Sequence, residues 1–234
     1  WRAYYRSIFN PARLKPAAMR AEMPVKYWKN LPETGLIAQM LAEREPLYRL
    51  ADLSGANSYS GITSVTAGTL AVSNQSGSGT GSGAVKVKAG TLGGSGIIAG
   101  NVTVGTGSGT GAFLAPATGT NKPATLTIQS VLTLNSDATY TYTFRAKQNK
   151  ARADKVIANG VTIKTGATFD LEGETNGRLR RGLSLTVLSN TSANPISGAF
   201  SNLPDGAIMT VNGNNLQASY SGGDGNDLTL TVVP

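Results

Sequence analysis

The stretch Ala67-Gly68-Thr69-Leu70 returns 22 residues later as Ala89-Gly90-Thr91-Leu92, within a region rich in Gly, Ser and Thr. A repeat of this length, with a glycine at each corner and alternating apolar residues between corners, describes one coil of chain. A single coil cannot bury its apolar face, so successive coils must stack on one another. The repeat therefore predicts a β-solenoid, an architecture that usually presents extended surfaces rather than catalytic pockets.

Apolar and polar residues alternate in the same way further along the chain. Val85 and Val87 are expected to face inward, while Lys86 and Lys88 face water. The same alternation recurs in the pairs Val102/Val104, Leu126/Ile128, Leu132/Leu134, Val161/Ile163 and Phe169/Leu171. Glycines that commonly provide a positive φ at corners stand at Gly68, Gly90, Gly160 and Gly166. At about 4.8 Å between strands and about 22 residues per coil, the stretch predicts on the order of eight coils.

Composition divides the chain near residues 45–52. Residues 1–50 hold nine Lys/Arg, both Trp and one Gly, whereas residues 51–234 hold the other 28 Gly and no Trp. We therefore expect residues 1–50 to be a short helical, basic segment punctuated by proline, a fragment of another domain. Residues 51–234 are expected to form the solenoid domain.

The composition lacks residue types that several classes of functional site require. The chain has no Cys and no His, which removes disulfides, thiolate metal sites and the commonest general base and metal ligand. No apolar run approaches the roughly 18 residues of a membrane helix. The chain begins with Trp1 and shows no signal peptide, so we expect any export signal and any anchor to lie outside this sequence.

Four runs within residues 53–234 carry a family resemblance: Leu53–Gly61, Val65–Val72, Gly83–Gly96 and Ile98–Val104. They resemble the autotransporter-associated β-strand repeat, and Leu203–Ala207 and Tyr220–Leu228 are similar to the carboxyl-terminal close of the same proteins. The resemblance implies a right-handed parallel β-helix, secreted or at the cell surface of a bacterium. It also implies a non-enzymatic passenger stalk, adhesin or secretion-supporting repeat.

No cofactor is expected, and the partner would be a surface ligand or a polysaccharide. The first coil lacks upstream repeats to cover it, which leaves an edge able to self-associate unless residues 1–50 cover that edge.

The amino-terminal segment carries a second resemblance, in Tyr4–Pro16 and Lys26–Glu33. It resembles the carboxyl-terminal tail of a bacterial domain of unknown function, described as a probable DNA metabolism protein and sometimes fused to a uracil-DNA glycosylase. Nucleic-acid binding is the resulting alternative, through Arg13, Lys15, Lys26, Tyr27, Trp28 and Lys29. The favoured interpretation is that the aromatic residues are core residues without their partner layer and that the basic residues form a solvated rim.

Tyr140, Tyr142 and Phe144 share one face of a predicted strand. They are expected to close the apolar core, with an aromatic platform for carbohydrate as the alternative. The basic stretch Arg145–Lys155 follows and is expected to be a protruding loop or a short helix.

Asp170, Glu172 and Glu174 fall at alternate positions, which places three carboxylates on one strand face. A carbohydrate-active β-helix enzyme could use such acids for general acid and base catalysis. The favoured interpretation is a solvated strand edge. Its charge would be balanced by Arg178, Arg180 and Arg181.

Gly222–Asp227 matches the start of a calcium-binding nonapeptide repeat, with Asp224 and Asp227 as candidate ligands. One copy supplies too few ligands, so we favour a hairpin turn between Leu216–Tyr220 and Leu228–Val232. The runs Gly77–Gly83 and Gly105–Gly111 look like phosphate cradles but lack the P-loop ending, and they are expected to be loops between coils.

Overall fold

Strands dominate the part of the chain that the computed structural model describes, residues 50–118, 122–147 and 150–234. Contacts divide the chain into two compact units, Trp1–Leu47 and Tyr48–Pro234. The helical segment predicted within residues 1–50 falls outside the described residues, apart from Leu50. Among the residues that are described, no helix is long and apolar enough to cross a membrane.

The strands form three sheets, named A, B and C. Sheet A contains β1 (Leu50–Leu53), β3 (Thr69–Val72), β5 (Gly90–Gly94), β8 (Ala112–Leu114), β11 (Ala138–Lys147), β12 (Lys150–Ala153) and β15 (Thr168–Asn176). Sheet B contains β2 (Thr63–Val65), β4 (Val85–Val87), β7 (Val102–Val104), β10 (Leu132–Leu134) and β14 (Val161–Ile163). Sheet C contains β6 (Ile97–Ile98), β9 (Thr125–Ile128), β13 (Lys155–Ala158), β16 (Ser184–Asn190), β17 (Ile208–Val211), β18 (Asn214–Gly222) and β19 (Asp227–Val233).

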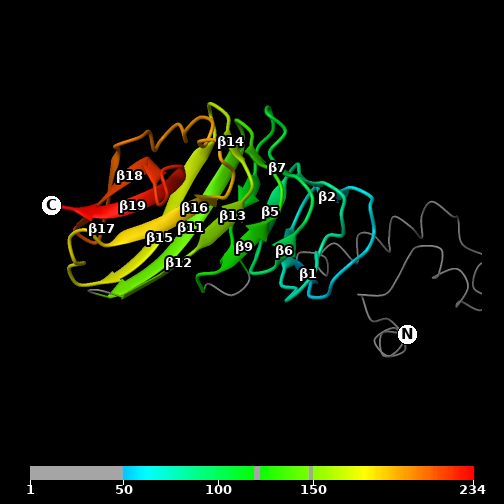
Figure 1. The fold of residues 1–234 in the computed structure, drawn as a ribbon, viewed down its shortest axis with the longest axis horizontal. Coiled ribbons are helices and arrows are strands. Elements are labelled where there is room, and N and C mark those ends of the chain that lie inside the picture. Colours follow the sequence, from blue (N-terminus) through cyan, green and yellow to red (C-terminus); the bar gives the residue numbers. More distant parts are fainter. Residues whose placement is uncertain (1–49, 119–121, 148–149) are drawn as a thin grey trace, which may run out of the picture. The chain divides into compact units, whose positions relative to one another are not determined.

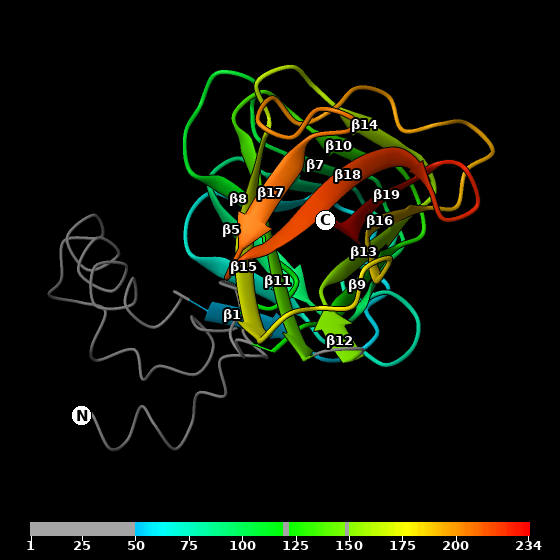
Figure 2. The same ribbon diagram turned by 90° about the vertical axis from the view of Figure 1, so that its left-hand side faces the viewer.

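The chain visits the sheets repeatedly in the order B, A, C. Thus β4, β5 and β6 are followed by β7, β8 and β9, and each strand pairs in parallel with its counterpart in the neighbouring turn of chain. Viewed along the stack, the three sheets surround a common interior (Figure 2). The antiparallel exceptions are β12 and the pairs among β16, β18, β19 and β17.

The predicted 22-residue period is confirmed where it was detected, because Leu70 pairs with Leu92. It does not extend to the whole chain. In sheet B, Val85 pairs with Val102 across 17 residues, and Val102 pairs with Leu132 across 30. The expectation of about eight coils is therefore wrong, since sheet B has five strands within the described residues. Lengthening a surface loop costs little closure entropy, so the loops vary while the strands keep their pairing.

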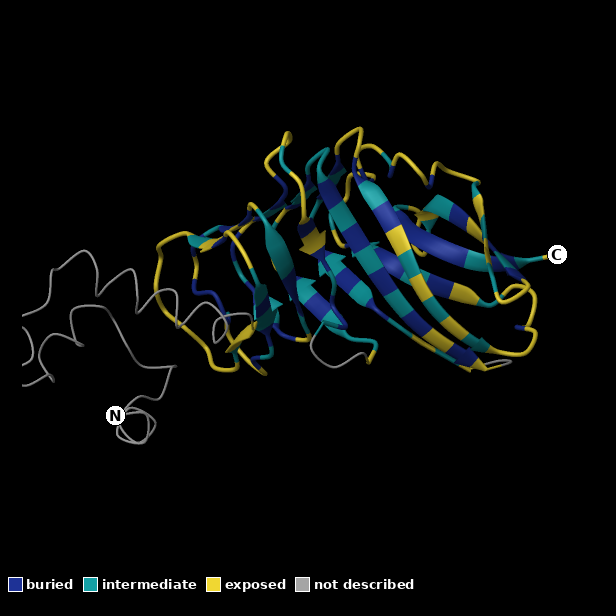
Figure 3. Cartoon of the chain, turned by 180° about the vertical axis from the view of Figure 1, so that it is seen from behind, coloured by how far each residue is buried: buried dark blue, intermediate teal, exposed yellow. Residues whose placement is uncertain are grey.

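Inward-facing side chains form one continuous core (Figure 3 shows the alternation of buried and exposed positions along the strands). The predicted inward residues of sheet B are confirmed as buried: Val85, Val87, Val102, Val104, Leu132, Leu134, Val161 and Ile163. Lys86 and Lys88 are exposed on the opposite face of β4 and after it. Period-two patterning thus decided which face of each strand is buried.

An aromatic cluster fills the interior beside β11. Tyr140, Tyr142 and Phe144 are fully buried, and the ring centroids of Tyr140 and Tyr142 lie 5.9 and 5.8 Å from that of Phe169. Tyr140 Oη donates a hydrogen bond to the carbonyl of Val187 on β16, which ties sheet A to sheet C. The predicted role in the core is confirmed, and the alternative of an aromatic platform for carbohydrate is wrong.

Residues 145–155 contain strands instead of the predicted loop or short helix. β11 continues to Lys147, and β12 returns antiparallel beside it (Figure 1). The inward positions of this hairpin carry the small side chains of Ala146, Ala151 and Ala153, while basic residues point outward. Because the inward residues are alanines, the strand pattern was too weakly apolar to be detected.

The carboxyl-terminal strands β18 and β19 form the predicted antiparallel hairpin. Leu216 pairs with Val232, Ala218 with Leu230, and Gly222 with Asp227 across the turn. β17 and β18 pass across one end of the interior (Figure 2), where Leu216 and Ala218 are buried. This antiparallel group covers apolar surface that would otherwise face water at that end.

Stacked glycine corners are a strict requirement of this fold. Gly68 and Gly90 have φ of 70° and 90°, and a Cβ on Gly90 would overlap the carbonyl oxygen of Gly68 in the adjacent coil. We therefore expect Gly90→Ala to lower the free energy of unfolding by about 2 kcal/mol or more, through strain and overlap together. Urea denaturation followed by circular dichroism measures the loss.

Two matched variants separate the causes. Gly182→Ala has a positive φ but open space around it, so it should lose about 1 kcal/mol from strain alone. Gly55→Ala has neither constraint and should be close to neutral. Equal losses in Gly90→Ala and Gly55→Ala would contradict the stacking of these corners.

Candidate functional site

Four basic side chains lie together on the outward face of the β11–β12 hairpin. Arg145 pairs in register with Arg152, and Lys147 pairs with Lys150. All four side chains are exposed and belong to the outward face. We call these four residues the basic hairpin. Like charges directly opposite each other on paired strands repel, so this arrangement is unfavourable unless an anion is present.

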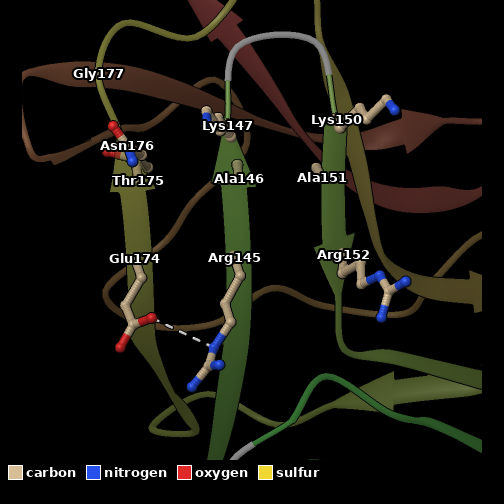
Figure 4. A pocket seen from close by; sticks show the side chains of 10 residues that line it. All are labelled: Arg145, Ala146, Lys147, Lys150, Ala151, Arg152, Glu174, Thr175, Asn176 and Gly177. Atoms are coloured by element: carbon tan, nitrogen blue, oxygen red, sulfur yellow. Dashed lines mark ion pairs between the residues drawn. The ribbon is translucent and has the colours of Figure 1, made fainter.

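A shallow depression runs between the basic hairpin and the end of β15, which pairs with β11 on its other side (Figure 4). It is lined by Arg145, Ala146, Lys147, Lys150, Ala151, Arg152, Glu174, Thr175, Asn176 and Gly177. Figure 4 shows the side chains of Glu174, Arg145 and Arg152 in one row across three strands. The lining is polar and cationic apart from the two alanines.

One carboxylate neutralises part of this charge. Arg145 Nε lies 3.3 Å from Glu174 Oε2, and the two side chains are 50% and 76% exposed. An ion pair this open to water contributes little stability and can be exchanged for another anion. Among the described residues, no carboxylate lies within ion-pair distance of Lys147, Lys150 or Arg152.

The three acids predicted to share a strand face do so. Asp170, Glu172 and Glu174 are all exposed on β15. Their neutralisation differs from the prediction, because Glu174 pairs with Arg145 of the neighbouring strand and not with the arginines that follow β15. Those arginines, Arg178, Arg180 and Arg181, are exposed.

The predicted turn at Gly222–Asp227 is confirmed. Asp227 Oδ1 accepts a hydrogen bond from the backbone N–H of Asn190, which joins the turn to the end of β16. Burial raises the pKa of the Asp227 carboxyl, the Asn190 hydrogen bond opposes that rise, and the charge of Asp224 adds to it. Asp224 itself is exposed, and no group of three or more His, Cys, Asp or Glu suited to a metal occurs among the described residues. Asp227 therefore serves the turn.

The glycine-rich run Gly105–Gly111 binds a carboxylate of its own chain. The backbone N–H groups of Thr106, Gly107 and Gly109 all donate to Asp137, at 2.7 to 2.9 Å. Successive amides in a glycine-rich loop form a concave anion site, and here a side chain of the next coil occupies it. The run is thus a loop between coils, as expected, with a role that the sequence interpretation missed.

Asp154 is a second carboxylate that the sequence interpretation left without a role. It is fully buried and accepts hydrogen bonds from the backbone N–H groups of Ala117, Ala124 and Thr143. Burial raises the pKa of Asp154, and those hydrogen bonds oppose the rise. The side chain joins the start of the β13 coil to the loop before β9. Only its position, as the sole acid in a basic stretch, could have marked it.

The six residues predicted as an alternative nucleic-acid site lie outside the described residues: Arg13, Lys15, Lys26, Tyr27, Trp28 and Lys29. The structure does bring together two groups that the sequence interpretation had kept apart. These are the basic hairpin, which was expected to be a loop or a short helix, and Glu174, which was expected to belong to a separate row of acids.

Comparison with known families gives a match at the amino terminus. Residues 1–33 are similar to a domain of unknown function, DUF4130. This agrees with the resemblance noted for that segment, and it ends before the first described strand. No curated protein matches the chain. The resemblance of residues 53–234 to autotransporter-associated repeats has no counterpart in these comparisons and stays a prediction.

The contacts of Asp137 lead to a pH-dependent prediction. Burial alone would raise its pKa, but the hydrogen bonds from Thr106 and Gly107 outweigh burial and lower the pKa below the ordinary value of 3.8. A carboxyl with a lowered pKa stabilises the fold above its unfolded pKa, and this contribution is lost as pH falls through the folded value. Asp137→Asn should therefore lower the free energy of unfolding by about 1 kcal/mol at neutral pH.

The difference between wild type and Asp137→Asn should begin to shrink as pH falls below about 4, and it should vanish only below the lowered folded pKa of Asp137, where its carboxyl is protonated in both states. Urea denaturation at a series of pH values measures it. Asp170→Asn, an exposed aspartate on β15, is the matched control and should change little at any pH. A constant difference for Asp137→Asn across the pH range would contradict a charge-dependent contact.

Proposed function

We propose that residues 50–234 form a right-handed parallel β-helix that acts as a non-enzymatic stalk or adhesive segment of an exported bacterial protein. The observation that carries the proposal is the repeated visit to sheets B, A and C with parallel pairing between neighbouring coils. Each coil covers the apolar side chains of the previous one. Repetition of the coil therefore produces an extended surface and not a single pocket.

Three further features support this proposal. The motifs that resemble autotransporter-associated repeats, such as Gly83–Gly96 and Ile98–Val104, coincide with strands and corners of successive coils. The corners predicted to need glycine, including Gly160 and Gly166, have φ of 104° and 106°. Hydrogen bonds from side chains also link adjacent coils, as between Asn74 and the N–H of Ile97. A fold assembled from local contacts between neighbouring coils suits a chain that folds as it emerges from a membrane.

Export can be tested directly with the whole 234-residue chain. It would be placed between a secretory signal peptide and an autotransporter translocator barrel in a Gram-negative host. We expect the chain to reach the cell surface and to resist protease added to intact cells, measured by immunoblotting. Retention in the periplasm with degradation would overturn the passenger proposal.

A matched pair of variants links display to the stacked core. Leu92 is fully buried on β5, so Leu92→Asp should abolish protease resistance because it leaves a carboxylate among apolar side chains. Lys86→Asp changes an exposed residue on β4 and should be displayed like the wild type. If both variants behave alike, display does not depend on the folded coils.

A second candidate function concerns the amino-terminal segment, and the DUF4130 match over residues 1–33 favours it. The earlier resemblance to a DNA-metabolism family suggests that this segment contacts nucleic acid through its basic and aromatic residues. Binding of labelled DNA that falls steeply with salt and is lost in Lys26→Gln/Lys29→Gln would support it. Binding indifferent to salt would refute it.

A further inference from the structure

We propose that the basic hairpin and the depression beside it bind an acidic polysaccharide, one that carries repeated sulfate or carboxylate groups. The binding face follows from the geometry of β11, β12 and β15. The choice of a polysaccharide rests on the surface function proposed above.

The basic hairpin is arranged to receive an anion. Arg145 lies opposite Arg152 and Lys147 lies opposite Lys150 across paired strands, so each pair places two cationic side chains next to each other on one face of the sheet. An anionic group between the members of a pair would relieve their repulsion and gain two charge-assisted contacts. Guanidinium groups suit sulfate and carboxylate because their N–H donors match two oxygens at once.

The two pairs are spaced for a polymer. They are two residues apart along the strands, which is about 7 Å at about 3.4 Å per residue. A ligand with repeated anionic groups can therefore engage both pairs together, and the second contact then forms within the same complex. Asn176, which pairs with Lys147 across β11 and β15, lines the same depression and offers a neutral hydrogen-bonding group for hydroxyls.

The composition of the lining distinguishes polysaccharide from other polyanions. Among the described residues, no aromatic side chain lines the depression, so the bases of single-stranded nucleic acid would find no ring there to stack on. Its apolar residues are two alanines, which give a membrane surface nothing to insert between lipid chains. A hydroxyl-rich, strongly charged polymer fits the remaining polar and cationic groups.

Glu174 acts as an internal competitor for the ligand. Its carboxylate already occupies one side of Arg145, at 3.3 Å. An incoming anion must share or displace this partner, so removal of the Glu174 charge should strengthen binding. A general attraction between a basic protein and a polyanion predicts only a slight gain from a single neutralised charge. The size of the gain in affinity therefore distinguishes binding at this site from attraction by net charge.

The test measures fluorescence anisotropy of a labelled heparin oligosaccharide with the whole chain, repeated with polygalacturonate as competitor. Lys147→Gln/Lys150→Gln should raise the Kd about tenfold, as expected for the loss of two exposed ion pairs. Glu174→Gln should lower the Kd about threefold. The matched control Lys86→Gln/Lys88→Gln removes the same charge from β4 and the residue after it, and should change the Kd less than about twofold.

Each other outcome overturns the proposal. Equal losses in the two double variants would indicate attraction by net charge alone. Absence of heparin and polygalacturonate binding by the wild type would refute the binding face and leave the export result unaffected. The wild type could also bind duplex DNA or phosphatidylserine vesicles more tightly than heparin, with the same dependence on Lys147 and Lys150. That result would assign the face to a different class of partner.

Discussion

Parallel hydrogen bonding between a strand and its counterpart one coil later is the constraint on which the rest of this structure depends. It fixes which residues lie above one another, so Leu70 stacks on Leu92 and Val102 on Leu132. It also brings backbone atoms of neighbouring corners so close that Gly90 has no room for a side chain. Burial of the aliphatic rows then stabilises a stack whose geometry the backbone has already set.

The same constraint explains the roles of three acids, Asp137, Asp154 and Asp227, at the contacts between coils. Loops between coils leave backbone N–H groups that no strand satisfies, and a buried donor without an acceptor is costly. Asp137 accepts such groups from Thr106 and Gly107, Asp154 accepts them from Ala117 and Ala124, and Asp227 accepts one from Asn190 at the end of β16. These carboxylates are structural parts of the coil-to-coil contact. The exposed charged side chains on β11, β12 and β15 do not accept backbone N–H groups in this way.

Sequence reasoning succeeded where a signal was local and periodic. Alternation at Val85–Val87 predicted the buried face, and the spacing of Gly68 and Gly90 predicted the register of β3 and β5. It failed at Arg145–Lys155, because alternation of alanine with lysine and arginine gives almost no hydrophobic signal. The neighbour of Arg145 is Glu174, 29 positions further along, and only the pairing of β11 with β15 brings them together. No single-sequence pattern encodes that proximity.

The unequal coils have a consequence for how such a protein can diversify. From β4 to β7 the chain takes 17 residues, and from β7 to β10 it takes 30, yet the three strands keep the same alignment despite the extra 13 (30 − 17). The packing of the interior therefore does not depend on the length of the loop inserted between two strands. The β11–β12 hairpin is such an elaboration, longer than the strands before it in sheet A. New recognition elements can be acquired at the periphery by insertion, without any compensating change in the residues that hold the stack together.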